Sequence, residues 1–259
     1  FRLKVDPWGK RATERLLIMK NLLKKIIFPV LHLISEILIV LKKHSLPGLP
    51  QTLKTYEKHY IEENQKSYDH FKNYFKTSVL LRGHDIHKYS IKRAIENDKN
   101  LTKFYIEFGV YTGTTINFFS KFVKNIYGFD SFEGLKEDWK GHSIMAGVFD
   151  LGAKIPKLNN NVIAVKGWVQ DTLPNFLKEK NPEINFIHMD LDTYESSKFV
   201  LSNLKPYISK NCIILFDELY NMTGWEVGEY KALREVFKEN EYKFLAFSRK
   251  DAQVAIQIL

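Results

Sequence analysis

The sequence contains a single cysteine, Cys212, so the chain cannot form an internal disulfide framework. That cysteine lies in the apolar run CIILF, which is typical of a buried strand. Because a chain without disulfides suits a reducing compartment, we expect a cytoplasmic location. At 259 residues, 44% of them hydrophobic, the chain can build one α/β domain plus an extension. The first residue is Phe1, which leaves open a longer natural chain or a removed targeting segment.

The sequence also carries little net charge beyond its first 50 residues. Residues 1–50 contain ten Lys/Arg and three Asp/Glu, a net charge of +7. The other 209 residues contain 29 Lys/Arg and 27 Asp/Glu, a net charge of +2. A nearly neutral main domain argues against a nucleic-acid groove, so we expect no nucleic-acid partner.

No apolar run in the N-terminal part is long enough to predict a membrane span with certainty. Residues 11–43 are helical in pattern, and the apolar run 26–41 is interrupted by Pro29, His32 and Glu36. Lysines flank this run on both sides. One interpretation is an amphipathic helix lying on an anionic membrane surface. The other is a helix that packs on the domain or forms the interface of a homo-oligomer.

The sequence divides into three segments. Residues 1–50 form the basic apolar arm, which ends in the linker Ser45–Pro50, and residues 51–99 form a helical lead-in or cap. Aromatic residues recur at positions 56, 60, 68, 71 and 75, a stripe that usually packs a core and could also cap a pocket. Residues 100–259 form the main domain. Within the lead-in segment, His84 and His87 flank Asp85, a weak metal signal for which a polar loop is the simpler explanation.

The sequence lacks the GxGxxG fingerprint of a dinucleotide site. In its place, residues 104–130 predict a strand, a glycine turn, a helix and a second strand. The turn reads Glu107-x-Gly109-x-x-x-Gly113, and the acid at the strand end would repel a pyrophosphate. A carboxylate about 20 residues on, Asp130, is placed to bind the two hydroxyls of a ribose. The pattern therefore indicates a cationic nucleoside ligand such as S-adenosylmethionine, although an ordinary strand-to-helix turn is an equally simple interpretation of the glycines alone.

The rest of the chain predicts alternating strands and helices. Strands are expected at 161–165, 184–189 and 212–216, and two final strands at 243–247 and 253–259 are joined by a short link, which requires an antiparallel hairpin. The polar loop 131–139 follows the second strand, and such loops usually carry ligand contacts. Trp168, just beyond the third strand, is placed to stack on an adenine or to fill the core.

Four carboxylates follow two consecutive strands of the predicted sheet: Asp190, Asp192, Asp217 and Glu218. Carboxylates brought together repel one another unless a cation lies between them. Mg²⁺ or Mn²⁺ prefers oxygen ligands and could activate a substrate hydroxyl. Helix capping explains one or two of these acids, but all four less well. His188 is a buried core histidine in the simplest interpretation and a minor candidate for the catalytic base.

These motifs together resemble class I S-adenosylmethionine-dependent methyltransferases, and among them the macrocin O-methyltransferase (TylF-like) family. The similarity covers about residues 100–259 and rests on EFGVYTGTT, GFDSFEGLKEDW, KGWVQDTLP, HMDLDTYES, LFDELYN and GEYKALREVF, in this order. Lys136 stands where the family loop often has proline. The resemblance does not extend to residues 1–80.

The resemblance implies a doubly wound, seven-stranded, mostly parallel sheet whose seventh strand is antiparallel. It implies methyl transfer to a hydroxyl, expected on a sugar of a glycan or glycosylated metabolite, with assistance from Mg²⁺ or Mn²⁺. The cofactor residues that it implies are Glu107, Gly109, Tyr111, Gly113, Thr114, Asp130, Ser131 and Trp168. The metal ligands that it implies are Asp190, Asp192, Asp217 and Glu218. The resemblance does not place the general base, for which Asp190, His188 and Glu218 are our candidates by position.

Two other classes of protein stay open at this point. A nucleotide-dependent oxidoreductase could use the same sheet, but the missing GxGxxG disfavours it. A non-catalytic membrane-peripheral or scaffolding protein could keep the fold. The intact group of four acids disfavours that interpretation, because carboxylates without a shared role are not expected to converge.

Overall fold

The computed structural model describes residues 30, 33, 34 and 54–259. Val30, Leu33 and Ile34 are helical and exposed, and the remaining predictions for residues 1–50 lie outside the described residues. Residues 55–259 form one compact unit. Among the described residues, no helix is both long and apolar enough to span a membrane.

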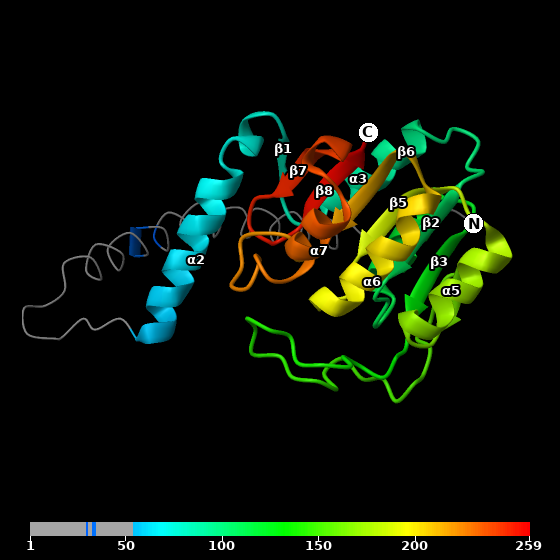
Figure 1. Cartoon of the computed structure of the whole chain (residues 1–259), viewed down its shortest axis with the longest axis horizontal. Helices are drawn as coiled ribbons and strands as arrows, with labels where there is room; N and C mark the ends of the chain where they lie inside the picture. The colour runs from blue at the N-terminus through cyan, green and yellow to red at the C-terminus, as the bar shows by residue number, and fades with distance from the viewer. Residues whose placement is uncertain (1–29, 31–32, 35–53) are drawn as a thin grey trace, which may run out of the picture. The chain divides into compact units, whose positions relative to one another are not determined.

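The unit is an eight-stranded sheet in the order β1-β7-β8-β6-β5-β2-β3-β4 (Figure 1). Strand β8 pairs antiparallel with both β6 and β7, and every other pairing is parallel. The bounds of the strands are β1 Val79–Leu81, β2 Phe104–Phe108, β3 Ile126–Asp130, β4 Val162–Lys166, β5 Ile184–Met189, β6 Ile208–Phe216, β7 Tyr242–Ser248 and β8 Val254–Ile258. The predicted Rossmann-like fold with its terminal antiparallel hairpin is confirmed, and the edge strand β1 is one more than predicted.

Helices cover both faces of the sheet. Their bounds are α2 Thr55–Phe71, α3 Asp85–Glu96, α4 Thr114–Phe119, α5 Val169–Lys180, α6 Tyr194–Leu204 and α7 Glu229–Val236. Short 3₁₀ turns lie at Tyr74–Lys76, Ser120–Phe122, Lys205–Tyr207 and Glu239–Glu241. Helices α5, α6 and α7 pack on one face of the sheet, the face toward the viewer in Figure 1, and α3 and α4 pack on the other.

Successive residues along each strand contribute to two separate cores. In β6, Ile214 and Phe216 belong to the core under α5, α6 and α7, whereas Ile213 and Leu215 belong to the core under α3 and α4. This division follows from the two-residue repeat of a strand that is buried on both faces. It also explains why these strands read as continuous apolar runs.

The aromatic stripe of α2 packs in the core only at its C-terminal end. Phe71 is fully buried and contacts rings that include Tyr220, Trp225 and Phe247. Tyr56 and Tyr60, by contrast, are 65% and 49% exposed. The helix is therefore anchored at one end.

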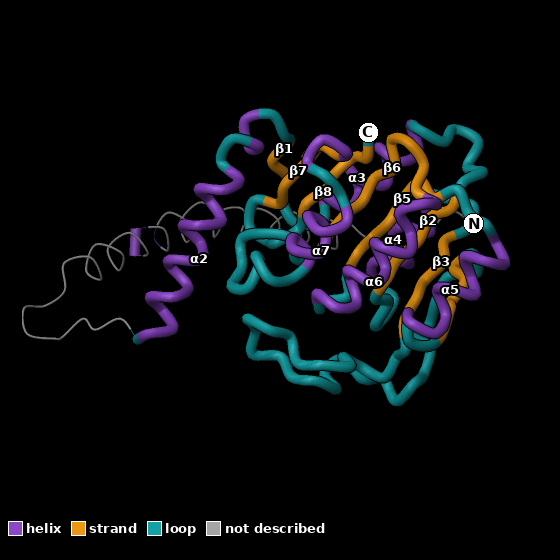
Figure 2. The backbone as a smooth tube through the Cα atoms, in the orientation of Figure 1, coloured by secondary structure: helices purple, strands orange, loops and turns teal. Residues whose placement is uncertain are grey.

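Parallel strands bring their carboxyl ends to one edge of the sheet. The loop of residues 131–161, between β3 and β4, runs along that edge in Figure 2. An isolated antiparallel bridge joins Glu133 to Asp150 within this loop. The loop therefore faces the strand tips from which the predicted site residues come.

Candidate functional site

A cavity of about 240 Å³ lies at the carboxyl ends of the parallel strands. Five strands, β2 to β6, each contribute a lining residue at or just beyond their carboxyl end. In strand order along the chain, these residues are Gly109, Asp130, Gly167, Asp190 and Glu218. The loop after β3 supplies further lining residues, among them Lys136, Trp139 and Phe149. Both the sheet and the long loop thus form the site.

The turn after β2 approaches the tip of β5 very closely. Gly109 has φ +86, and a Cβ atom on it would lie 1.7 Å from the carbonyl oxygen of Asp190. The Asp190 amide donates to the Phe108 carbonyl oxygen at 2.9 Å, which holds the two strand tips together. Only glycine fits at this position, both for its backbone angle and for its space.

Asp130, the last residue of β3, ties this turn to the neighbouring strand. Its Oδ2 accepts hydrogen bonds from the amides of Val110 and Tyr111, at 2.8 and 2.7 Å. Its Oδ1 accepts one from the amide of Phe132 at 2.7 Å. Two carboxylate oxygens can accept about four hydrogen bonds, so the group keeps capacity for a ligand in the cavity.

The predicted cofactor residues divide into two groups. Gly109, Tyr111, Asp130, Ser131 and Trp168 line the cavity, whereas Glu107, Gly113 and Thr114 are not among its lining residues. A Cβ atom on Gly113 would lie 2.6 Å from Leu158 Cδ2, so this glycine packs against the loop that leads to β4.

Trp168 is partly buried at the start of α5, and the ammonium group of Lys136 lies 5.5 Å from the centre of its ring. Sequence reasoning did not single out Trp139 or Lys136 as individual cavity residues, although both lie in the loop that it expected to carry contacts.

Three carboxylates meet on one wall of the cavity. One oxygen each of Asp190, Asp192 and Glu218 lies within 4.8 Å of the others. Burial, followed by repulsion from Asp217, raises the pKa of Asp190 and Glu218 well above their usual values and raises the pKa of Asp192 to about 7. These groups resist simultaneous ionisation, and a bound cation would relieve their repulsion.

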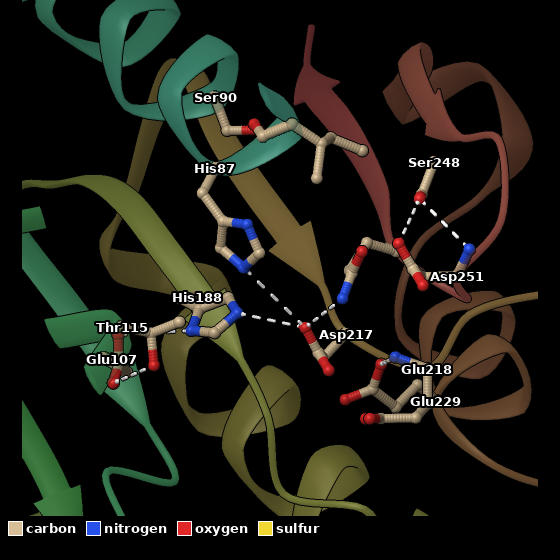
Figure 3. Close-up of polar contacts among 12 residues, drawn as sticks. His87, Ser90, Glu107, Thr115, His188, Asp217, Glu218, Glu229, Ser248 and Asp251 are labelled. Atoms are coloured by element: carbon tan, nitrogen blue, oxygen red, sulfur yellow. Dashed lines mark hydrogen bonds and ion pairs between the residues drawn. The ribbon is translucent and has the colours of Figure 1, made fainter. Parts of the chain in front are cut away.

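Asp217, the fourth predicted acid, is not among the lining residues of the cavity. Its Oδ1 accepts a hydrogen bond from Gln253 Nε2 at 3.0 Å and lies 3.6 Å from His188 Nε2 (Figure 3). Burial opposes ionisation of this carboxyl group, but His188 outweighs it and holds the pKa of Asp217 below its usual value. Asp217 is therefore the acid of this group that ionises most readily, whereas Asp190, Asp192 and Glu218 resist ionisation.

A buried histidine connects Asp217 with Glu107. The side chains of His188 and Glu107 are fully buried, and His188 Nδ1 lies 3.2 Å from Glu107 Oε2. Although burial disfavours the charged imidazole, Asp217 and Glu107 raise the pKa of His188 well above its usual value. Thr115 Oγ1 donates to Glu107 Oε1 at 3.2 Å. Glu107 thus faces the interior of the domain.

Glu229 of α7 was not predicted as a functional residue, and it holds the backbone of Glu218. Its Oε2 accepts a hydrogen bond from the Glu218 amide at 3.0 Å, and the side chain is fully buried. Burial raises the pKa of Glu229 well above its usual value. Glu229 lies 11 positions after Glu218 in the sequence, so no local pattern predicted this contact. The only sequence signal at Glu229 was that its segment, GEYKALREVF, belongs to the family resemblance.

A second cavity of about 230 Å³ adjoins the first and shares Trp139, Asp192 and Thr193 with it. Lys140, Tyr194 and Lys231 also line this second cavity. Trp139 stacks on His142, with ring centres 4.3 Å apart. A ligand here would meet aromatic and cationic side chains beside the carboxylate wall.

Comparisons with known proteins agree with this geometry. A family model described as "Methyltransferase domain" matches residues 106–219. No curated protein matches the chain. Among the solved structures that match, two share the fold at low sequence identity. CalS11, a calicheamicin methyltransferase, is 22% identical, with a TM-score of 0.55 over 82% of this chain and 99% of CalS11. The O-methyltransferase NovP is 20% identical, with a TM-score of 0.51 over 67% of this chain and 78% of NovP. Residues 106–219 are thus similar in sequence to a methyltransferase domain, and the two solved structures share the fold of this chain.

Proposed function

We propose that this chain transfers a methyl group from S-adenosylmethionine to a hydroxyl group of a sugar, as a member of the TylF-like family. One observation carries the proposal: three carboxylates converge on a cavity whose other walls are the glycine turn, Asp130 and Trp168. Such a cavity combines the features of a cationic nucleoside site with those of a site for activating a hydroxyl group.

The chain's own residues would hold the cofactor in the first cavity. Asp130 would accept hydrogen bonds from the ribose hydroxyls, and Trp168 would cover the adenine. Gly109, Tyr111 and Ser131 would line the path of the cofactor. The shape of the glycine turn would be fixed by three residues outside the cavity lining, Glu107, Gly113 and Thr114. Bound there, S-adenosylmethionine supplies an electrophilic methyl group on a sulfonium.

The carboxylate wall fits a hard divalent cation. Asp190, Asp192 and Glu218 offer only oxygen donors, which Mg²⁺ and Mn²⁺ prefer, and three carboxylates with oxygens within 4.8 Å of one another favour a cation between them. Asp217, directly behind, adds negative charge. Bound there, Mg²⁺ would supply positive charge that lowers the pKa of a nearby hydroxyl group.

Asp190 is the best placed residue for moving the proton. It lines the cavity, and because burial raises its pKa above the usual value, its ionised carboxylate is a stronger base toward a hydroxyl proton. Glu218 is placed similarly. His188 is fully buried and flanked by two carboxylates. We therefore assign it the role of orienting Asp217, and not a direct contact with the acceptor.

The second cavity is our candidate for the acceptor site. It is lined by Asp192 and Thr193 and by Trp139 and Tyr194, which are aromatic side chains of the kind that pack against sugars. CalS11 is described as a TDP-rhamnose 3′-O-methyltransferase, which supports a sugar hydroxyl as the acceptor group. The acceptor would be a small molecule or a glycan.

Calorimetric titration with S-adenosylhomocysteine, in EDTA and then in Mg²⁺, tests the cofactor assignment. We expect micromolar binding by the wild type and at least a tenfold loss in Asp130→Asn, with Asp150→Asn, an exposed acid outside the first cavity's lining, as the matched control. Undetectable binding by a folded sample in both buffers would overturn the proposal. Tight binding of NADH would favour an oxidoreductase instead.

The basic arm suggests a place for the enzyme. From its sequence alone, we propose that residues 11–43 contact a membrane surface that carries a lipid-linked acceptor, or that they form an oligomer interface. Replacing Lys24, Lys25, Lys42 and Lys43 by glutamine should reduce binding to anionic liposomes if the first role holds. Unchanged binding, together with a dimer in sedimentation, would favour the second.

A further inference from the structure

Two histidines and one carboxylate meet in the interior of the domain, behind the cavity. His87 comes from α3, His188 from β5 and Asp217 from the end of β6 (Figure 3). One ligand atom of each residue lies within 4.8 Å of the others. The two histidines are 5% and 0% exposed, so the group is closed to bulk water on most sides.

We propose that His87, His188 and Asp217 bind a transition-metal ion of the Zn²⁺ class, distinct from the hard cation assigned to the carboxylate wall. Imidazole nitrogen suits Zn²⁺ and its neighbours in the first transition row far better than it suits Mg²⁺. A His₂Asp donor set therefore selects a different metal from the all-oxygen wall of the cavity.

The distances are close to those that such an ion requires. At Zn–N and Zn–O bond lengths of about 2.1 Å, neighbouring ligand atoms of a tetrahedral site lie about 3.4 Å apart. His188 Nε2 is 3.6 Å and His87 Nε2 is 4.0 Å from Asp217 Oδ1.

His188 Nε2 would hold the metal in place of the proton of the charged imidazole. It is buried and has no hydrogen-bond partner in the part of the chain that the structure describes. Its other nitrogen, Nδ1, lies 3.2 Å from Glu107 Oε2. A carboxylate on the far side of a metal-binding histidine fixes the tautomer that leaves Nε2 available.

The surroundings also hold the other partners in place. Thr115 donates to Glu107, and Gln253 donates to Asp217 Oδ1. Metal sites characteristically have such an outer layer of hydrogen bonds to their ligands. Neither histidine is among the lining residues of the two cavities, so the ion would act structurally, by joining α3 to β5 and fixing Asp217 behind the carboxylate wall.

Competition titration of the full chain tests this site. The chain is stripped with a chelator and titrated with Zn²⁺ against a chromogenic chelator, in excess Mg²⁺ to occupy the carboxylate wall. We expect one tightly held Zn²⁺ per chain. Loss of an outer partner alone costs about 10–100-fold in metal affinity, so His87→Ala should weaken binding at least about 100-fold and Glu107→Gln about 10–100-fold.

His84→Ala is the matched control, because His84 immediately precedes α3, is exposed, and is not part of the three-residue group. It should bind Zn²⁺ like the wild type, and so should Asp192→Asn, whose lost ligand belongs to the carboxylate wall. Equal affinities of the wild type and His87→Ala, or no tight binding by the wild type, would overturn the proposal. If His87→Ala does not fold, His87→Gln replaces it, and Co²⁺ absorption of the wild type reports directly whether imidazole ligands are present.

Discussion

The contact between Gly109 and Asp190 makes a sharp prediction about stability. A Cβ atom at position 109 would stand 1.7 Å from the Asp190 carbonyl oxygen, about half of an ordinary contact distance. Gly109→Ala therefore forces the tips of β2 and β5 apart. The displacement would also stretch the hydrogen bond from the Asp190 amide to the Phe108 carbonyl oxygen.

The expected cost has three parts. A left-handed backbone angle costs an alanine about 1–2 kcal/mol, overpacking costs about 1–3 kcal/mol, and a weakened hydrogen bond costs about 0.5–1.5 kcal/mol. We expect a loss of about 3–6 kcal/mol in the free energy of unfolding, measured by urea denaturation with far-UV circular dichroism.

Gly147 provides the control that isolates the clash. Its φ of +81 nearly equals that of Gly109, but nothing lies within 4 Å of a Cβ atom built on it. Gly147→Ala should therefore lose only the backbone part, about 1–2 kcal/mol. Equal losses in the two variants would refute the packing argument and leave the backbone angle as the whole effect.

Further predictions concern the carboxylates and their supports. Because burial raises the pKa of Asp192 to about 7, above the unfolded value of about 3.9, the folded chain binds more protons between these values. In EDTA, the stability of the fold should therefore fall as pH rises from about 4 to 7. In thermal melts, stabilisation by Mg²⁺ should grow across the same pH range. A melting temperature in EDTA that does not change with pH would contradict the pKa shift. Asp192→Asn keeps a residue type that tolerates φ +61 and should raise the melting temperature in EDTA while reducing the Mg²⁺ effect; an undiminished Mg²⁺ effect would remove Asp192 from the metal site. Thr115→Val deprives the buried carboxylate of Glu107 of its hydroxyl donor and should cost about 1–3 kcal/mol in urea denaturation, whereas Thr112→Val, on the exposed part of the turn, should cost much less.

The main features of the fold could be predicted from the sequence because parallel strands carry a strong local signal. The predicted strand 184–189 coincides with β5, and the antiparallel hairpin follows from a short link between two apolar runs. Strand β1 escaped prediction, since its three residues, Val79–Leu81, are too few to show a periodicity. Its existence depends on pairing with β7, far along the chain.

The candidate site was predictable where its residues follow strands directly. Asp130, Asp190 and Glu218 reach the cavity because each ends or follows a parallel strand. Glu107 precedes its turn by only two residues, but the two-residue alternation of the strand sends its side chain inward. The sequence pattern showed the acid without showing which side of the sheet it faces.

The role of His87 could not be predicted from its neighbours in sequence. Its spacing from His84 favoured a polar loop, whereas α3 begins at Asp85 and buries His87 against the sheet. The ring of His188, with its centre 5.6 Å away, lies 101 positions later in the chain. Contacts of this kind depend on how a helix docks, which no local pattern encodes.

The central position of β8 has a consequence for the synthesis of the chain. Residues 254–258 are the last strand in sequence order, yet they lie between β6 and β7 and are all buried. While a ribosome still holds these residues, β7 and β1 have no strand through which to join the parallel part of the sheet. The domain can therefore complete its sheet only after residue 258 has left the exit tunnel, so stalled or slightly shortened chains would expose the edge of β6 to the quality-control machinery of the cell.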